Sequence, residues 1–492
     1  MNPQIRRLFF VFTALFVALV GMSSYWLWKA PDLEARRGNP NLIVRQLTIK
    51  RGLIYASDGR TRFAVNRKRR VQGRTWYLRR YPQRGLAAQT IGYSTVQRSR
   101  AGLEKSLNDY LTGSNANLHT LLDTTLDKLR GLTQTGNNVV TTINVRAQRV
   151  AMQALTGKCG AVVALDPTNG KVLVIASSPT YNPNLIERHF REATTASAPC
   201  QPAAPLLNRA TDGLFIPGST FKVVTSAAAL DSGRFRPSST FVDRGYCIEY
   251  GKKVLNFADQ SGPEVFGTVD FTQALEHSIN AVFCEIGKRL GPHLILDYAK
   301  RFGFYDTPPL ETPSDERSPS GLYSHGKLIL PKDPNAIDVG RLAFGQERML
   351  VTPLQMAMIA QTVANDGVLL EPHVVDRIVA PDGTVIERPG REVIRRAIKP
   401  TTAAELTAMM EAVVRGGTGT AAQIPGVPVA GKTGTAETGR PGENDTWFIA
   451  FAPADHPRVA VAVGLQNQSG TGGTTAAPIA KAIIEAVLRG NA

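Results

Sequence analysis

Residues 216–230, I-P-G-S-T-F-K-V-V-T-S-A-A-A-L, decide how the rest of this chain is interpreted. A Pro-Gly pair precedes Ser219, and apolar residues then recur at helical spacing, which predicts a helix that begins near Ser219. The first amides of a helix lack intrahelical partners and favour negative charge. Lys222 would share a helix face with Ser219, a spacing typical of an activated nucleophile. For a lone S-x-x-K, the ordinary alternative is a helix-capping serine with a solvated lysine.

Two further motifs follow in order along the chain. S-I-N at 278–280 lies in an amphipathic run that predicts helix over 270–290, and K-T-G-T at 432–435 follows the strand-like V-P-V-A-G. Taken singly, these motifs could be a helix serine bonded to a carbonyl, a cap and a turn. The order S-x-x-K, S-x-N, K-T-G is the signature of penicillin-binding proteins and class A β-lactamases.

The chain resembles the class B penicillin-binding proteins, most closely the actinobacterial penicillin-binding protein A group. The resemblance extends to G-A-V-V-A-L-D-P at 160–167, to A-F-G-Q-E-R-M-L-V-T-P at 343–353 and to G-T-G-T-A-A at 417–422. It covers residues 137–490 firmly and the preceding region loosely. It implies a peptidoglycan D,D-transpeptidase that acts on stem peptides and is acylated by β-lactams.

The resemblance assigns roles to eight residues of this sequence. The catalytic residues would be Ser219 as nucleophile, Lys222 as base, Ser278 as proton relay, Asn280 as partner of Lys222 and of the substrate amide, and Lys432 as the group that polarises the relay. The substrate-binding residues would be Thr433, Gly434 and Thr435, with the backbone amides of Ser219 and Thr435 forming an oxyanion hole. The resemblance implies no cofactor, and the histidine spacing suggests no metal site.

Related reactions share this signature. A carboxypeptidase transfers the acyl group to water, a β-lactamase hydrolyses the antibiotic, and a penicillin sensor keeps the acyl group as a signal. The chain has no E-x-x-x-N element between residues 280 and 432 to supply a deacylating base. We therefore expect a long-lived acyl-enzyme. An N-terminal anchor with a basic pedestal, the class B resemblance and the absence of a multi-span sensor region favour the transpeptidase.

Charge is concentrated near the N-terminus. Residues 1–136 contain 23 Lys and Arg against 7 Asp and Glu, and the whole chain has a net charge of +17. The run R-K-R-R at 67–70 would suit nucleic acid, a membrane surface or an anionic polymer. The adjacent membrane anchor argues against nucleic acid.

Residues 8–28 contain no charge and end in Y-W-L-W at 25–28. Such a stretch is long enough to cross a bilayer and ends in an aromatic belt, whereas the apolar part of a signal peptide has only about 7–15 residues. We expect an uncleaved, single-pass anchor in the cell membrane. Basic residues flank both ends, so charge does not settle orientation; the resemblance implies a catalytic domain outside the cytoplasm.

The predicted organisation has three parts. Residues 1–29 form a short cytoplasmic tail and anchor, 30–136 a basic, β-containing pedestal without catalytic motifs, and 137–492 the penicillin-binding transpeptidase domain. By analogy with the family, the pedestal would dock a membrane glycan polymerase or other division or elongation proteins.

The transpeptidase domain is predicted to be α+β. It would begin with a strand at 139–143, and a long loop would cover 307–333. An antiparallel sheet would be formed by strands at 160–166, 171–177, 427–437, 446–452 and 458–465. Helices are expected at 219–232, 270–290, 353–366, 401–415 and 474–488.

The four cysteines, Cys159, Cys200, Cys247 and Cys284, have no zinc-ligand spacing. In an exported domain they could pair in three ways, or they could be buried thiols, and the sequence does not choose among these possibilities.

Overall fold

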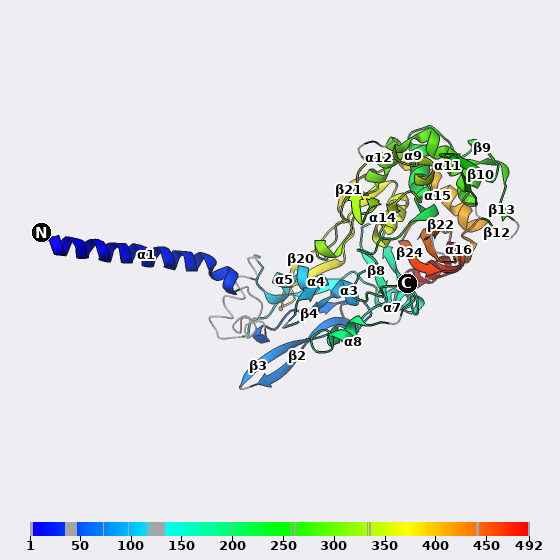
Figure 1. Ribbon diagram of the computed structural model, residues 1–492. Coiled ribbons are helices and arrows are strands. Elements are labelled where there is room, and N and C mark those ends of the chain that lie inside the picture. Colours follow the sequence, from blue (N-terminus) through cyan, green and yellow to red (C-terminus); the bar gives the residue numbers. More distant parts are fainter. Residues whose placement is uncertain are drawn as a thin grey trace.

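The computed structural model shows an N-terminal helix, a β-rich pedestal and a larger α+β body (Figure 1). It describes residues 3–34, 47–71, 73–96, 98–115, 120, 133–196, 198–256, 258–259, 262–331, 333, 336–438 and 442–490. Most of the residues outside these ranges belong to the predicted pedestal.

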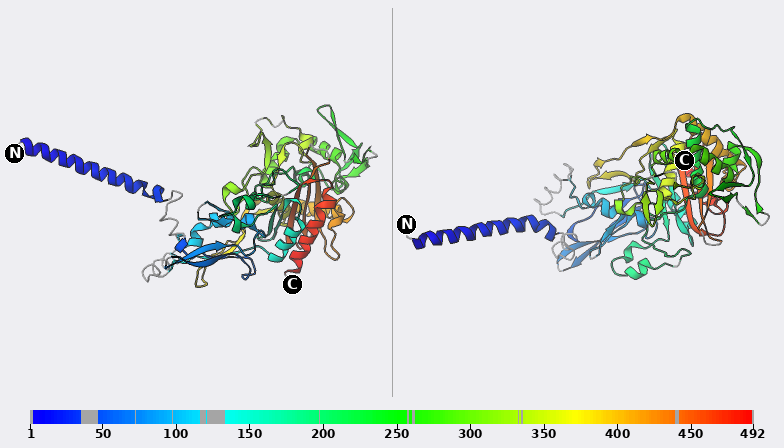
Figure 2. Two further views of the ribbon diagram at one scale, coloured as in Figure 1. Left: turned by 60° about the horizontal axis from the view of Figure 1, so that its bottom comes forward. Right: turned by 45° about the horizontal axis from the view of Figure 1, so that its top comes forward.

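Helix α1 (Pro3–Glu34) stands apart from the rest of the chain in every view (Figures 1 and 2). Its residues 3–26 are long and apolar enough to cross a membrane, and none of them is buried against the protein. Phe9, Phe12 and Phe16 are each more than 60% exposed, as expected for side chains that would face lipid. The predicted apolar span is therefore a single helix.

The pedestal sheet combines strands from distant parts of the chain. Its order is β20-β19-β6-β1-β2-β3, in which β1 and β6 are parallel and the other neighbours are antiparallel. The strands are β1 (Ile54–Tyr55), β2 (Arg62–Val71), β3 (Arg74–Arg80), β6 (Asn138–Thr141), β19 (Val375–Val379) and β20 (Val385–Glu387). The strand predicted to open the second domain is instead a central member of this sheet, because its buried Val139 pairs with the buried Ile54.

The rest of the described pedestal is small and packs beside this sheet. It consists of α3 (Ala88–Ile91), β4 (Tyr93–Ser94), β5 (Arg100–Ala101), α4 (Gly102–Ser106) and α5 (Asn108–Thr112).

The larger body carries the three motifs that are predicted to be catalytic, and we name it the catalytic body for that reason. It is built on a five-stranded sheet whose neighbours are all antiparallel, as predicted. Its order is β22-β23-β24-β7-β8, so β22 lies at an edge. The strands are β7 (Cys159–Leu165), β8 (Val172–Ser178), β22 (Ala430–Glu437), β23 (Asn444–Ala452) and β24 (Val459–Gln468). Asp166 accepts hydrogen bonds from the backbone and hydroxyl of Thr168 and closes the predicted hairpin between β7 and β8.

Helices cover both faces of this sheet. Along β7, Val162 and Ala164 face the cluster formed with α7 (Val145–Ala154) and α17 (Ala477–Arg489). The alternate residues Ala161 and Val163 face the cluster formed with α14 (Pro353–Ala364). Because strand side chains alternate between faces, both sides of the sheet must be apolar, which explains the continuous apolar runs in its sequence.

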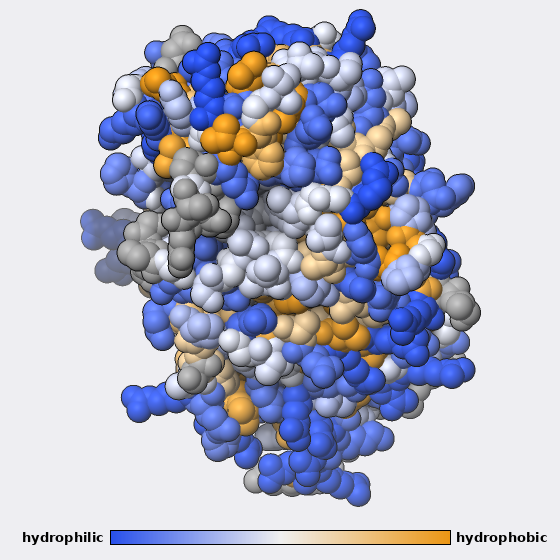
Figure 3. All heavy atoms as spheres, turned by 90° about the vertical axis from the view of Figure 1, so that its right-hand side faces the viewer, coloured by the Kyte–Doolittle hydropathy of each residue, from blue (hydrophilic) through white to orange (hydrophobic). Residues whose placement is uncertain are grey.

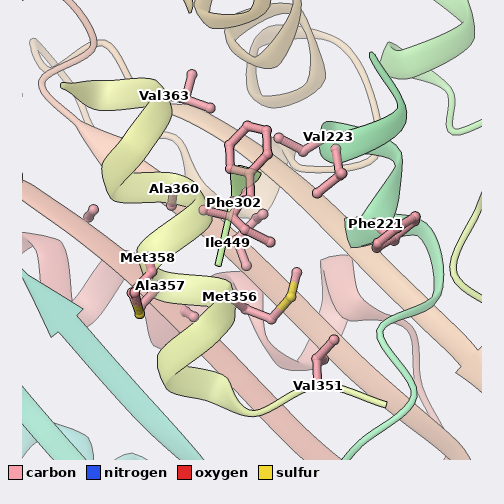
Figure 4. Close-up of a cluster of buried hydrophobic side chains, with 14 of the residues drawn as sticks. Phe221, Val223, Phe302, Val351, Met356, Ala357, Met358, Ala360, Val363 and Ile449 are labelled. Atoms are coloured by element: carbon pink, nitrogen blue, oxygen red, sulfur yellow. The ribbon is translucent and has the colours of Figure 1, made fainter. Parts of the chain in front are cut away.

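Helix α9 (Lys222–Asp231) packs against the α14 side and is buried along its whole length. Phe221 and Val223 lie in the cluster that also contains Met356 and Ile449 (Figure 4). At the other end, the Asp231 carboxylate accepts hydrogen bonds from Tyr298, Thr402 and the Lys399 backbone. The helix that follows Ser219 is therefore fixed at both ends.

The remaining elements surround this core. The helices are η1 (Pro183–Leu185), α8 (Phe190–Thr194), η2 (Gly218–Phe221), α10 (Phe271–Glu276), α11 (Asn280–Leu290), α12 (Pro292–Arg301), η3 (Ser314–Glu316), α13 (Val339–Leu342), α15 (Pro400–Arg415), η5 (Thr420–Ala422) and α16 (Gly472–Thr475). The strands are β9 (Thr240–Asp243), β10 (Tyr246–Glu249), β11 (Lys252–Leu255), β12 (Ala258–Asp259), β13 (Gly262–Pro263), β14 (Gly267–Asp270), β15 (Gly321–Ser324), β16 (Lys327–Ile329), β17 (Met349–Leu350), β18 (Val368–Leu370) and β21 (Val393–Arg396).

The structure corrects the loop predicted over 307–333. Strands β15 and β16 form a hairpin within it, and β15 also pairs with β17. The Pro and Gly residues that suggested a loop lie near the ends of these short strands. Leu322, an apolar residue on β15, is fully buried.

A buried ion cluster fixes α4 in the pedestal. The Glu104 carboxylate is fully buried and pairs with Arg51 (2.9 Å) and Arg79. Burial by itself raises the pKa of Glu104, but the charges of Arg79 and Arg51 outweigh it and hold the pKa below its usual value. The neighbouring Lys105–Asp315 pair is largely exposed.

These two pairs provide a matched test. Glu104→Gln should lower the free energy of unfolding by about 3–5 kcal/mol, because it leaves two buried guanidinium groups without their counter-ion. Lys105→Gln, at the exposed pair, should change it by less than about 1 kcal/mol. Urea denaturation measures both, and equal losses would show that burial does not set the strength of this cluster.

Candidate active site

Ser219 lies in a short 3-10 turn, η2, just before α9. The predicted α-helix therefore begins three residues later, at Lys222, because the Pro-Gly pair leads first into the tighter turn. The N-cap of this turn is Pro217, so Ser219 is not the helix-capping residue of the ordinary alternative. The side chain is partly exposed, as a nucleophile must be, whereas the flanking Gly218 and Thr220 are buried.

Two glycines let β22 pass directly against this turn. A Cβ atom added to Gly218 would lie 3.0 Å from the Ala436 Cβ and 3.1 Å from the Thr435 carbonyl oxygen. A Cβ at Gly434 would lie 2.9 Å from the Pro217 carbonyl oxygen. Gly218 also has a φ of 50°, which favours glycine. The S-x-x-K and K-T-G motifs are thus in contact because neither side carries a side chain at these points.

Lys222 begins α9 and its amine is fully enclosed. Its Nζ donates to the Ser278 carbonyl (2.6 Å), the Ser278 Oγ (3.2 Å) and the Asn280 Oδ1 (2.8 Å). The ring of Phe283 lies 5.0 Å from the same nitrogen. Burial first, and then the positive charge of Lys432, lower the pKa of Lys222 well below its usual value. A lowered pKa increases the share of neutral amine, which is the form that can accept a proton.

Ser278 stands at a break between α10 and α11, where continuous helix was predicted. Its φ is 59°, a left-handed conformation that ends α10 and turns the Ser278 carbonyl to Lys222. Side-chain hydrogen bonds mark the start of each of the two helices. Asp270 and Gln273 form a capping box that starts α10, and the Ala281 backbone amide donates to the Asn256 side chain at the start of α11. The periodic apolar pattern did not reveal the interruption because both helices bury the same side.

Asn280 is the first residue of α11. Its Oδ1 accepts from Lys222, and its Nδ2 donates to the Leu255 carbonyl on β11 at 3.1 Å. The side-chain amide therefore has a fixed orientation.

Lys432 approaches the same serine from β22. Its Nζ donates to the Ser278 Oγ at 2.9 Å and to the Thr433 carbonyl at 3.0 Å. Burial lowers the pKa of Lys432 to about 7. Ser278 thus lies between two buried amines, and the structure brings Lys222, Ser278, Asn280 and Lys432 into one hydrogen-bonded group.

The threonines after Lys432 have partners that the sequence did not indicate. The Thr433 hydroxyl lies 2.6 Å from the Thr418 hydroxyl, and the Thr435 hydroxyl accepts from the Gly472 amide at 3.1 Å. Thr418 belongs to the G-T-G-T-A-A stretch at 417–422, to which sequence analysis assigned no role beyond the resemblance. The spacing of residues along the sequence does not show that the hydroxyls of Thr418 and Thr433 lie next to each other.

Asp445 is a further residue that sequence analysis missed. It is buried on β23 and accepts a hydrogen bond from the Ile216 amide at 3.2 Å, while the Trp447 indole donates to the Ile216 carbonyl at 2.9 Å. Burial raises the pKa of Asp445 to about 6. Both groups hold the chain that leads into Ser219.

The structure pairs the cysteines as Cys159–Cys200 and Cys247–Cys284. The second disulfide joins β10 to α11, the helix that carries Asn280 at its start. Glu249 lies beside Cys247 and Cys284. The two cysteine sulfurs are bonded to each other, so they are not available to bind a metal.

Comparisons with known proteins agree with this geometry. The family model of the penicillin binding protein transpeptidase domain matches residues 160–485, and that of the penicillin binding protein A dimerisation domain matches 51–139. The peptidoglycan D,D-transpeptidase PbpA of Mycolicibacterium smegmatis is 35% identical over 99% of both chains, and the enzyme of that name from Mycobacterium tuberculosis is 34% identical over the full length of both.

Solved structures show the same similarity in three dimensions. Penicillin-binding protein A from M. tuberculosis, as its ceftriaxone acyl-enzyme complex, superposes with a TM-score of 0.80 and 33% identity, covering 91% of this chain and 100% of that structure. Penicillin-binding protein 3 from the same organism superposes with a TM-score of 0.73 and 26% identity over 90% of this chain and 96% of that structure. This chain therefore belongs to the penicillin-binding protein transpeptidase family.

Proposed function

We propose that this chain is a peptidoglycan D,D-transpeptidase that cross-links stem peptides through an acyl-enzyme at Ser219. The observation that supports it best is the position of the Ser278 hydroxyl between the amines of Lys222 and Lys432. This arrangement offers a base, a relay and a second cation beside a partly exposed serine.

Acylation would begin with attack of the Ser219 Oγ on the carbonyl of the penultimate D-Ala. Neutral Lys222 takes the serine proton, since its lowered pKa leaves it able to accept one. The tetrahedral intermediate carries a negative oxygen, which the backbone amides of Ser219 and Thr435 would stabilise. The C–N bond then breaks, and the terminal D-Ala leaves with a proton relayed through Ser278 from Lys222.

Substrate binding would use the free edge of the sheet. β22 pairs only with β23 among the described strands, so its outer edge can align an extended peptide. The hydroxyls of Thr433 and Thr435 would bind the substrate carboxylate, and the Asn280 amide would bind the peptide backbone. Figure 3 views the molecule from the side on which Figure 1 places β22.

In the second step, an amine of another stem peptide attacks the Ser219 ester. The amine loses a proton to Lys222 and Ser278, the new amide forms, and Ser219 is released. Hydrolysis would instead need a base that activates water. Glu347, an acidic residue in the 343–353 stretch, is paired with Arg348 at 2.6 Å rather than available for that task.

We further propose that α1 is a single-pass anchor and that the pedestal and catalytic body lie outside the cytoplasm, where the substrate is assembled into the wall. The two disulfides support this location, because disulfides persist in oxidising compartments. By family analogy, the pedestal would dock a membrane glycan polymerase or other division or elongation proteins.

The nucleophile assignment has a direct test. Ser219→Ala should abolish covalent labelling by a fluorescent penicillin, since no other oxygen replaces the attacking atom. The control Ser232→Ala, just beyond the other end of α9, should label normally. Retained labelling of the Ser219 variant would refute the assignment.

The two lysines predict a pH dependence. Wild-type acylation should decrease as pH is lowered, because Lys222 becomes protonated and no longer accepts the serine proton. Lys432→Gln should move this acid limb to higher pH, because it removes the charge that helps to lower the pKa of Lys222. Lys222→Arg should reduce acylation about 10²–10⁴-fold at every pH tested.

The measurement is the apparent second-order rate constant of penicillin labelling between pH 5 and pH 9. An acid limb at the same pH in the wild type and the Lys432 variant would contradict the proposed coupling of the two amines.

The lifetime of the acyl-enzyme separates the related reactions. After labelling and removal of free penicillin, label should persist for many minutes, because the described site offers no base opposite the relay. Loss within seconds would indicate a β-lactamase. Incubation with a D-Ala-D-Ala stem peptide then distinguishes the rest: cross-linked dimer supports the transpeptidase, whereas D-Ala release without dimer indicates a carboxypeptidase, and absence of both indicates a sensor.

A further inference from the structure

The hairpin formed by β2 and β3 projects from the pedestal at the end of the molecule from which α1 emerges. Figure 1 and both views of Figure 2 show it on this side, away from the catalytic body. The two strands pair continuously from Val65–Arg80 to Val71–Arg74. A ten-residue strand is about 33 Å long, so the hairpin extends well beyond the pedestal core.

The charge of this hairpin is entirely positive. Residues 62–80 contain eight Lys and Arg and no Asp or Glu. One of these eight side chains, Arg79, is not exposed, because it pairs with the buried Glu104. Five others around the tip are exposed and have no ion pair or side-chain hydrogen bond with any part of the chain that the structure describes: Arg67, Lys68, Arg69, Arg70 and Arg74.

Aromatic side chains lie among these charges. Arg69 pairs across the hairpin with Trp76, and Lys68 pairs with Tyr77 on the opposite face. Both rings are partly exposed, although the indole nitrogen of Trp76 is itself buried, so Tyr77 offers the polar edge. Basic side chains next to Trp and Tyr suit the boundary between water and lipid headgroups, because the rings are amphipathic and the cations meet phosphate.

The length of the connecting chain keeps the hairpin near the bilayer. α1 ends at Glu34, and the twelve residues 35–46 separate it from Leu47, where the described pedestal starts. Twelve residues span at most about 40 Å. The hairpin is therefore within reach of the membrane surface, on the same side as the catalytic body, whichever way α1 is inserted.

We propose that the β2–β3 hairpin is a second, electrostatic membrane contact that binds the headgroups of anionic phospholipids. Together with α1 it gives the ectodomain two points of attachment and so limits its rotation on the membrane. Attraction of this kind falls off within a Debye length, which is about 10 Å at 0.1 M salt and 3 Å at 1 M. The contact should therefore be lost in high salt, whereas insertion of α1 should not.

Energy transfer between the hairpin and the lipid surface tests this proposal. All four native cysteines are in disulfides, so Thr75→Cys on exposed β3 supplies a single thiol for a donor dye. The full chain is placed in nanodiscs containing headgroup-labelled acceptor lipid, made of phosphatidylcholine alone or with phosphatidylglycerol. Transfer efficiency should be higher with phosphatidylglycerol and should fall to the phosphatidylcholine value in 1 M salt.

Two triple variants, which remove the same number of positive charges, test whether the lipid dependence of energy transfer arises from the hairpin. Arg67→Gln/Arg69→Gln/Arg70→Gln should abolish the difference between the two lipids. The control replaces three exposed arginines of the catalytic body that have no side-chain partner among the described residues, and it should keep the difference: Arg236→Gln/Arg244→Gln/Arg458→Gln. Penicillin labelling checks that all variants are folded.

Two outcomes would overturn the proposal. If wild-type efficiency is the same in both lipids, the hairpin does not bind anionic headgroups and serves another partner. If the hairpin and control variants lose the difference equally, attraction is a property of the net charge of the chain and not of the hairpin.

Discussion

The Ser278 hydroxyl lies within hydrogen-bonding distance of two buried amines, and most of the catalytic body serves to keep it there. Two ammonium groups so close in a dry site repel each other, so at least one is held neutral. A neutral lysine beside a serine is the chemical requirement for acyl transfer. The arrangement needs three separate segments to meet: the start of α9, the break before α11 and the edge strand β22.

This meeting is energetically unfavourable by itself. A left-handed conformation at a non-glycine residue such as Ser278 costs about 1–3 kcal/mol, and burial of Lys222 and Lys432 costs more because it opposes their charged forms. Packing on both faces of the central sheet offsets these costs. The full burial of α9, with Asp231 fixing its far end, holds Lys222 in place beside Ser278. The site is therefore preorganised by the core.

The sequence was sufficient where residue type and order carry the information. The three motifs predicted which side chains would gather, and apolar runs predicted the five strands of the central sheet and helices α9, α14, α15 and α17. The sequence was insufficient where the local structure depends on a single backbone dihedral angle or on a partner far away in the sequence. Nothing in the apolar periodicity of 270–290 indicates that the backbone of Ser278 is left-handed. The position of Asp445 in an apolar strand likewise does not indicate that its carboxylate would accept a hydrogen bond from the Ile216 amide. The cysteine pairs likewise needed three-dimensional proximity.

The composition of the pedestal sheet has a consequence for the order in which the chain folds. β1 to β3 are synthesised early, but β19 and β20 lie about 300 residues later and complete the other edge. Contacts so distant in sequence form slowly, because a long loop must close first. During synthesis, Val139 on β6 therefore lacks its β19 neighbour until most of the catalytic body has been made, and the pedestal sheet cannot be completed before then. A fragment that stops near residue 136 would lack half of its own sheet, so anchor, pedestal and enzyme mature as one unit.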